Sequence, residues 1–150
     1  MVAFLSVLVL GSSGILAGVL AAVALGIVPA FMGLTPQQYI PVHKLVGQYF
    51  DRVMPPLVIS STIVDAILAG VVSSTLRAAF FAVAAFALVG VSLISQLGNV
   101  PINKVVKQTD PLLIDQHWAD PRPRWARWHL ARTLLSLSAL AANIVAALVR

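Results

Sequence analysis

Cysteine is absent from the sequence, and charged residues are scarce. Without cysteine the chain can form no disulfide, no thiolate metal site and no cysteine nucleophile. Only 10% of the 150 residues are charged and 59% are hydrophobic, with a mean hydropathy of +0.94, which is typical of membrane proteins. No polar stretch is long enough for a separate soluble domain, so we expect one membrane domain over residues 1–150.

Long apolar segments predict the architecture. The first charged side chain is Lys44, and the run before it is too long and not basic enough for a secretory signal, so we expect a retained membrane anchor. Four segments are apolar and long enough to cross a bilayer as helices: about 3–31, 57–74, 78–98 and 127–149. The sequence therefore predicts an all-α, four-helix transmembrane bundle.

The connection between the first two spans contains residues that favour a helix and residues that interrupt one. Thr35 before Pro36 is typical of a helix N-cap, but Pro41 interrupts any simple helix. Met54-Pro55-Pro56-Leu57 favours a stop followed by a new helix. We therefore expect a short interfacial segment over 34–55, with Tyr39 and Tyr49 at headgroup depth.

The connection between spans three and four is longer and more polar. Pro101 is expected to bend or end the third helix, and charged residues then dominate residues 104–126. Trp118 and Trp125 fit the aromatic belt at the membrane interface, and His117 is expected to be solvated.

Basic residues are distributed unequally along the chain. Eight belong to the two longer connections and their flanking helix ends, whereas two lie on the opposite side: Lys44, Arg52, Lys104, Lys107, Arg122, Arg124, Arg127 and Arg132 against Arg77 and Arg150. Because basic residues collect on the cytoplasmic side, we expect cytoplasmic connections and external termini, in a bacterial plasma membrane. Anionic headgroups then explain the net charge of +5, and nucleic acid is not an expected partner.

Small residues recur every four positions in the first span. Gly14, Gly18, Ala22 and Gly26 make one smooth face, which in lipid allows helices to approach closely. Packing explains these glycines, and a surplus of such faces favours an oligomer or a membrane-protein partner.

Polar side chains within the spans are the candidates for function. Asp65 is costly in lipid unless it is protonated or has a partner, such as Ser61 or an arginine from another helix. One face of the third helix carries Ser92, Gln96, Asn99 and Asn103; one face of the fourth carries His129, Arg132 and Ser136. Such faces should point into the bundle, either fastening helices or meeting a ligand.

The runs Asn99-Val-Pro-Ile-Asn103 and Trp125-Ala-Arg-Trp-His-Leu-Ala-Arg-Thr133 carry a resemblance. With the glycine-rich first span and the Met54-Pro-Pro-Leu57 sequence, the chain resembles the anthrone oxygenase-like family (DUF1772) over essentially its whole length. The resemblance implies a compact four-helix membrane bundle. It also implies, for the characterised pathway members, oxygenation of an anthrone to an anthraquinone without metal or flavin.

Two hypotheses follow. In the first, the chain is a cofactor-free oxygenase of a hydrophobic anthrone-like polyphenol, with His129 as base and Arg132 and Asn99 stabilising the anion. Asn103 would position the substrate, Gln96 would lie beside it, and His43 is the reserve base. In the second, the chain is a non-catalytic scaffold or accessory subunit. His43, His117 and His129 have no carboxylate at ligand spacing on the same face, so no metal site is expected.

Overall fold

Helices form all the regular structure in the part of the chain that the computed structural model describes, residues 1–114 and 118–149. Two helices contain a π-helical turn, and a short 3₁₀ turn follows α5. The elements are α1 (Val2–Ala22), η1 (Val23–Ile27), α2 (Val28–Gly33), α3 (Pro36–Val71), α4 (Thr75–Ile94), η2 (Ser95–Asn99), α5 (Val100–Gln108), η3 (Pro111–Leu113) and α6 (Arg122–Leu148).

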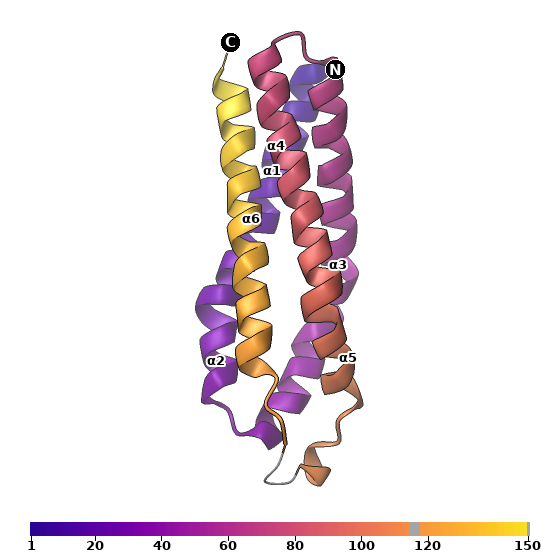
Figure 1. Cartoon of the computed structure of the whole chain (residues 1–150), viewed down its shortest axis with the longest axis vertical. Coiled ribbons are helices and arrows are strands. Elements are labelled where there is room, and N and C mark those ends of the chain that lie inside the picture. Colours follow the sequence, from indigo (N-terminus) through magenta and orange to yellow (C-terminus); the bar gives the residue numbers. More distant parts are fainter. Residues whose placement is uncertain (115–117, 150) are drawn as a thin grey trace.

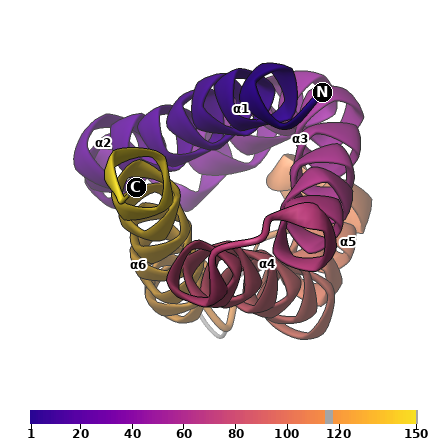
Figure 2. The ribbon, with the colours of Figure 1, turned by 90° about the horizontal axis from the view of Figure 1, so that it is seen from above.

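Four continuous helices are long and apolar enough to cross a bilayer: Val2–Gly33, Pro36–Val71, Thr75–Gln108 and Arg122–Leu148. The protein is therefore an integral membrane protein with the predicted four-helix bundle. Seen from above, α1, α3, α4 and α6 stand in a ring in chain order (Figure 2). The two termini lie at one end of the bundle and the connection between α5 and α6 at the other (Figure 1).

The predicted interfacial segment is wrong, because residues 36–71 form one helix. Thr35 is the expected N-cap, and Gln38 completes a capping box by accepting from the Thr35 backbone. Pro41, Pro55 and Pro56 all lie inside this helix. Each removes one helical donor, but apolar side chains on both sides of the prolines pack into the bundle and keep the helix continuous.

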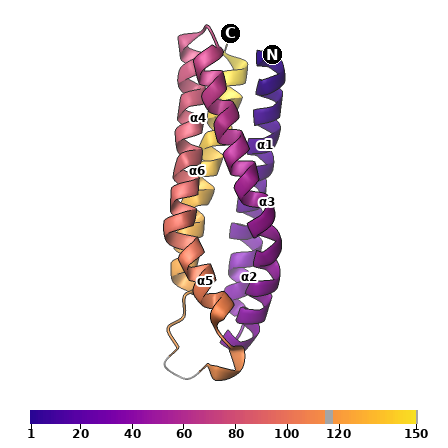
Figure 3. The same cartoon turned by 90° about the vertical axis from the view of Figure 1, so that its right-hand side faces the viewer.

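The predicted end of the third span near residue 98 is also wrong. The helix continues past Pro101 to Gln108, through the π-helical turn η2, and α5 extends α4 towards the connection (Figure 3). The first span has the same construction, with η1 before Pro29. Both contain the sequence Leu-Gly-x-Val-Pro, at 25–29 and 97–101. The wider π turn accommodates a proline, which can neither donate nor fit a regular turn.

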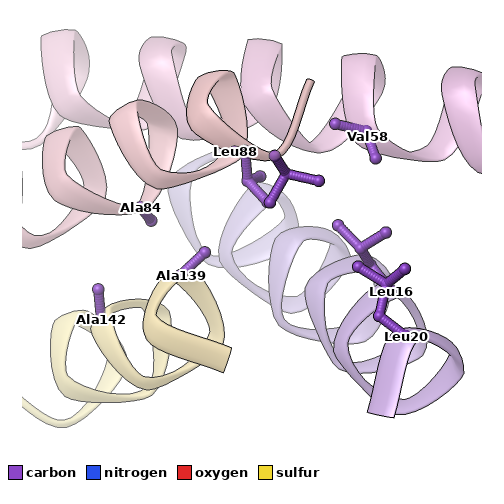
Figure 4. Close-up of a cluster of buried hydrophobic side chains, with 8 residues drawn as sticks. Leu16, Leu20, Val58, Ala84, Leu88, Ala139 and Ala142 are labelled. Carbon is purple, nitrogen blue, oxygen red and sulfur yellow. The ribbon is translucent and has the colours of Figure 1, made fainter. Parts of the chain in front are cut away.

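Three layers of apolar side chains fill the bundle. The central layer brings Leu16 and Leu20 of α1 against Val58 of α3, with alanines where α4 and α6 approach each other (Figure 4). Phe81 and Leu68 lie in the layer near the termini. The layer near the connection is aromatic: Phe31, Tyr39 and Trp125. Tyr39 is fully buried inside the bundle, whereas Tyr49 is exposed.

The glycine face of the first span does not pack inside the bundle. A Cβ added at Gly14, Gly18 or Gly26 would meet nothing within 4 Å. Within the described chain no helix packs closely on these glycines, because this face of α1 points outward, and packing against another molecule stays a prediction. The close approach occurs at Gly98, where a Cβ would lie 2.5 Å from the Trp128 ring.

Basic side chains cap helix carboxyl ends at both ends of the bundle. Arg122 donates from Nη1 to the carbonyls of Phe31 and Leu34, at 2.9 and 2.6 Å, where α2 ends. Arg77 donates to the Ala146 carbonyl of α6 at 3.1 Å, and Lys44 to that of Thr109 at 2.8 Å. These four hydrogen bonds satisfy or supplement carbonyls at helix ends, which would otherwise be costly in or near lipid.

Asp120 holds Arg122 in place through an ion pair of 2.7 Å. Burial tends to raise the pKa of Asp120, but hydrogen bonds from Arg122 and its charge outweigh burial and hold this pKa below its ordinary value. The stabilisation is therefore present above the pKa of the unfolded chain and is lost as the pH falls through the folded-state pKa.

We expect Arg122→Gln to destabilise the bundle, because it removes the cap of α2 and leaves Asp120 unpaired. Hydrogen bonds to charged groups contribute about 1.5–3 kcal/mol each, so the melting temperature should fall by roughly 5 °C or more. Thermal unfolding in detergent measures this. Arg124→Gln is the matched control, since Arg124 is exposed two residues away. Equal melting temperatures for the two variants would contradict this role of Arg122.

Candidate functional site

A cavity of about 240 Å³ lies inside the bundle, lined by side chains of all four spanning helices. It is larger than an engineered cavity of about 150 Å³ that holds benzene, so a small aromatic molecule fits in principle. Five of the predicted site residues line it: His43, Gln96, Asn99, Asn103 and Arg132. Apolar side chains from α1 and α3 make up most of the remaining wall.

The Leu-Gly-x-Val-Pro repeat gives the cavity one apolar wall and one polar wall. On the first span Val23, Ile27 and Phe31 line it. The residues at the equivalent positions of the third span, 72 further along the chain, also line it: Ser95, Asn99 and Asn103. Two helices of similar construction thus present hydrocarbon on one side and hydrogen-bonding groups on the other.

His43 is buried beside this polar wall. Its Nε2 lies 3.1 Å from Oδ1 of Asn103, which also accepts from Nε1 of Trp125 at 2.9 Å. An indole nitrogen can only donate, so Oδ1 is the acceptor and the Nε2 of His43 carries hydrogen. The lone pair of His43 is then on Nδ1, which is buried and has no hydrogen-bond partner in the described residues. This nitrogen is available to accept a proton.

His129 is fully buried and both its ring nitrogens are engaged. Nε2 donates to the Leu20 carbonyl at 3.0 Å, at the start of the widened η1 region. Nδ1 accepts from Arg132, 3.1 Å from Nε and 2.8 Å from Nη2. Trp125 stacks on the ring at 5.2 Å between centroids, and His129 is not among the residues lining the cavity. This arrangement fixes the Arg132 guanidinium.

Arg132 brings a positive charge to the cavity wall. Besides the two bonds to His129, its Nη1 lies 3.4 Å from Oγ of Ser95. Within residues 1–114 and 118–149 it forms no ion pair with a carboxylate. A guanidinium held by neutral partners at an apolar cavity is suited to an anionic oxygen of a ligand.

Asn99 and Gln96 lie on the same helix turn but in different surroundings. Asn99 is buried and donates to the Trp125 carbonyl at 3.1 Å, while its Oδ1 has no donor in the described chain. Oδ1 can therefore accept from a ligand hydroxyl. Gln96 lines the cavity and is also exposed on the outer surface of the bundle.

Asp65 and Ser136 lie apart from the cavity. Asp65 is fully buried and accepts from Nδ2 of Asn143 at 3.4 Å, so its partner is neither of those predicted. The Ser61 hydroxyl instead lies 2.8 Å from both the Ser12 hydroxyl and the Leu57 carbonyl, and donates its one hydrogen to one of them. Ser136 is buried and donates to the Thr133 carbonyl. Asp65 is six residues from the end of α3, near the terminal end of the bundle.

The sequence reasoning missed Trp125 and Phe31. Trp125 is buried against both histidines, with ring centroids 5.5 Å from His43 and 5.2 Å from His129, so its assignment to the interfacial belt is wrong. A signal was present: an aromatic residue precedes each histidine by four positions, as Tyr39 precedes His43. On a helix this spacing puts both rings on one face.

In the described ranges, no three His, Asp or Glu side chains are close enough to hold a metal ion together. His117, expected to be solvated, lies outside the described residues.

Comparison with known proteins gives one match. The family model described as anthrone oxygenase matches residues 44–142, which include Gln96, Asn99, Asn103, His129 and Arg132 and begin one residue after His43. No curated protein and no solved structure matches the chain.

We expect Gly98→Ala to disturb the polar wall, because the added methyl would meet the Trp128 ring at 2.5 Å. Overpacking of this kind costs about 1–3 kcal/mol, which should appear as a lower melting temperature. Gly26→Ala, at the equivalent position of the first repeat, is the control and should have little effect, since nothing lies within 4 Å. A Gly98→Ala variant as stable as Gly26→Ala would contradict the close contact.

Asp65→Asn should leave the melting temperature unchanged or raise it. The amide has the shape of the carboxylate without its charge, can accept from Asn143, and can donate to the Asn143 Oδ1, which has no partner in the described chain. The comparison is Asp65→Ala, which removes this acceptor of Asn143 and leaves a cavity in the core, and it should unfold at lower temperature. A loss of stability as large for Asp65→Asn as for Asp65→Ala would show that the ionised carboxylate is required.

Proposed function

The chain belongs to the anthrone oxygenase family, and on this premise we propose that it oxygenates an anthrone-like aromatic ketone in the bundle cavity without a cofactor. One observation carries the proposal: an unengaged imidazole nitrogen of His43 and the cationic Arg132 line the same mainly apolar cavity. A base, an anion stabiliser and an apolar slot are what this reaction requires of a protein.

The chemistry needs little beyond deprotonation. The methylene carbon of an anthrone loses a proton to give an enolate that is delocalised over the ring system. Its electron pair forms a bond from this carbon to O₂, and protonation gives a hydroperoxide. Loss of the second hydrogen as a proton, with cleavage of the O–O bond, leaves the quinone carbonyl and releases hydroxide, which becomes water. One oxygen atom of O₂ is therefore in the product and the other in water.

His43 is assigned as the base in place of His129. The Nδ1 of His43 has its lone pair available, because Asn103 accepts from the other ring nitrogen. The Nδ1 of His129 already accepts from Arg132 and its Nε2 donates to Leu20. His129 therefore serves to hold Arg132, and Asn103 serves to orient His43.

Arg132 is assigned to the enolate oxygen. Negative charge develops on this oxygen when the proton leaves, and a fixed guanidinium stabilises it without reorganisation. Asn99 accepts from a phenolic hydroxyl through its free Oδ1. A polyphenol with its hydroxyls along one edge would thus face the polar wall.

The distribution of basic residues supports a cytoplasmic location for the connection end of the bundle, and external termini. The cavity would then lie in the cytoplasmic half of a bacterial plasma membrane.

Oxygen uptake with anthrone, measured on the protein in nanodiscs against empty nanodiscs, tests the proposal. We expect His43→Ala to lower kcat by about 10²–10⁴-fold, as loss of a general base does, and also to lower the melting temperature, because the side chain is buried and bonds Asn103. Added imidazole should restore part of the rate. His129→Ala should lower both the rate and the melting temperature, because it releases Arg132 and removes the bond to Leu20.

Two results would contradict these assignments. Oxygen uptake no faster than in empty nanodiscs would exclude the oxygenase. If His43→Ala retained the wild-type rate of oxygen uptake, and His129→Ala lost this rate while its melting temperature stayed that of wild type, His129 would be the base.

A non-catalytic role is the second candidate, and the outward glycine face of α1 favours it. A Cβ at Gly14, Gly18 or Gly26 would meet nothing within 4 Å in the described chain, so this face leaves room for a second copy or another membrane protein. An inactive protein that forms a stable oligomer, lost on Gly18→Leu, would support this alternative.

A further inference from the structure

We propose that the substrate enters the cavity sideways from the bilayer, through a seam between α3 and the α4–η2 helix. This inference rests on the proposed function, because it concerns how the same cavity is reached. The occupant is an uncharged aromatic molecule, dissolved in the lipid, that carries a hydroxyl or carbonyl group. Three features of the molecule carry the argument: a second hollow, an exposed edge of the cavity, and closure towards the headgroups.

The second hollow is a groove on the outer surface between α3 and α4. It has a volume of about 240 Å³ and is lined by Ile59, Thr62, Ile63, Val89, Ser92, Leu93 and Gln96. Ile59, Ile63 and Leu93 are 56%, 54% and 55% exposed, so the groove faces the lipid. Ile59, Ser92 and Gln96 also line the inner cavity. The two hollows therefore meet at these three side chains.

The exposed edge of the cavity lies on the same seam. Most cavity residues are buried or half-buried, but Asp51, Pro55 and Ile59, which share one face of α3, and Gln96 of η2 are exposed. The prolines at 55 and 56 remove two helical donors from α3 at this level, and η2 is a widened turn. Neither helix has a regular ridge here to fill the groove of the other.

Polar ties close the seam further towards the connection. Asp51 of α3 forms an ion pair with Lys107 of α5, and His43 of α3 forms a hydrogen bond with Asn103 of α5. Beyond them the aromatic rings of Phe31, Tyr39 and Trp125 pack together, at 5.3 Å between the first two and 5.9 Å between Phe31 and Trp125. The cavity is thus shielded on the side of the headgroups.

Gln96 indicates what passes through. Its side chain is exposed in a lipid-facing position and makes no hydrogen bond in the described part of the chain, which is costly for an amide in hydrocarbon. A hydroxyl or carbonyl of an arriving ligand would pair with it. An acyl chain offers no such partner, so the amide favours an oxygen-bearing aromatic molecule over lipid.

Cysteine labelling tests the route, and the cysteine-free chain is a clean background. Val23→Cys places a thiol on the apolar cavity wall, on the first span rather than on either helix of the seam. The protein in nanodiscs is treated with N-phenylmaleimide, which is uncharged and lipid-soluble, or with a sulfonate-bearing methanethiosulfonate, which stays in water. Each rate is divided by the rate for the same variant denatured in detergent. We expect the maleimide to be faster by about tenfold or more.

A blocking substitution locates the seam. Ile59→Trp covers the point where groove and cavity meet and should slow maleimide labelling of the cavity thiol by about tenfold. Ile67→Trp is the matched control, an identical change two turns along the same lipid-facing helix, and should leave the rate unchanged. Should Ile59→Trp fail to fold, Leu93→Trp covers the groove from α4.

The outcomes separate the route from the reaction. Equal relative rates for the two reagents, or no effect of either blocking tryptophan, would overturn the lateral route even in an active oxygenase. Maleimide labelling that accelerates only after delipidation would identify an acyl chain as the occupant and also overturn it. Since labelling requires no turnover, the expected pattern in a protein without oxygenase activity would support the route and contradict the reaction.

Discussion

Hydrogen bonds from the side chains of one helix to the backbone carbonyls of another hold this bundle together. Carbonyls at helix ends lack helical donors and are costly in lipid unless another group donates to them, and a carbonyl within a helix can still accept a second hydrogen bond. His129 donates to Leu20 and Asn99 to Trp125 within the bundle. Arg122 and Arg77 do the same at its two ends. These hydrogen bonds fix the axial position of each helix relative to its neighbours, which apolar contacts between smooth helices do not fix.

The site depends on this constraint. Because the Leu20 carbonyl takes the Nε2 hydrogen of His129, the other nitrogen of this ring must accept, and it takes Arg132. The same logic fixes His43, where Asn103 accepts and Nδ1 is left free. Two histidines that follow an aromatic residue by four positions therefore reach opposite states, one engaged and one available. Their different hydrogen-bond partners decide this.

The four spans and the inward polar faces could be predicted, because periodicity and hydropathy report burial directly. The predictions failed at Pro41, Pro55, Pro56 and Pro101, where local preference favours a break but packing on both sides keeps the helix intact. Trp125 was misplaced because its composition signal, an aromatic beside arginines, is also that of an interfacial belt. The engagement of His129 could not be foreseen, since it depends on a backbone carbonyl more than a hundred residues away.

The two walls of the cavity also have a consequence for selectivity. A hydroxyl finds no hydrogen-bond partner on the side chains of Val23, Ile27 and Phe31. It can form hydrogen bonds with the side chains at the equivalent positions, Ser95, Asn99 and Asn103. A flat tricyclic ligand with its oxygen atoms along one edge can then bind in only one orientation. In the reverse orientation, these oxygen atoms would be buried against apolar side chains. Regioselectivity would thus arise from the different side chains at equivalent positions of two similar helices, independently of the catalytic groups.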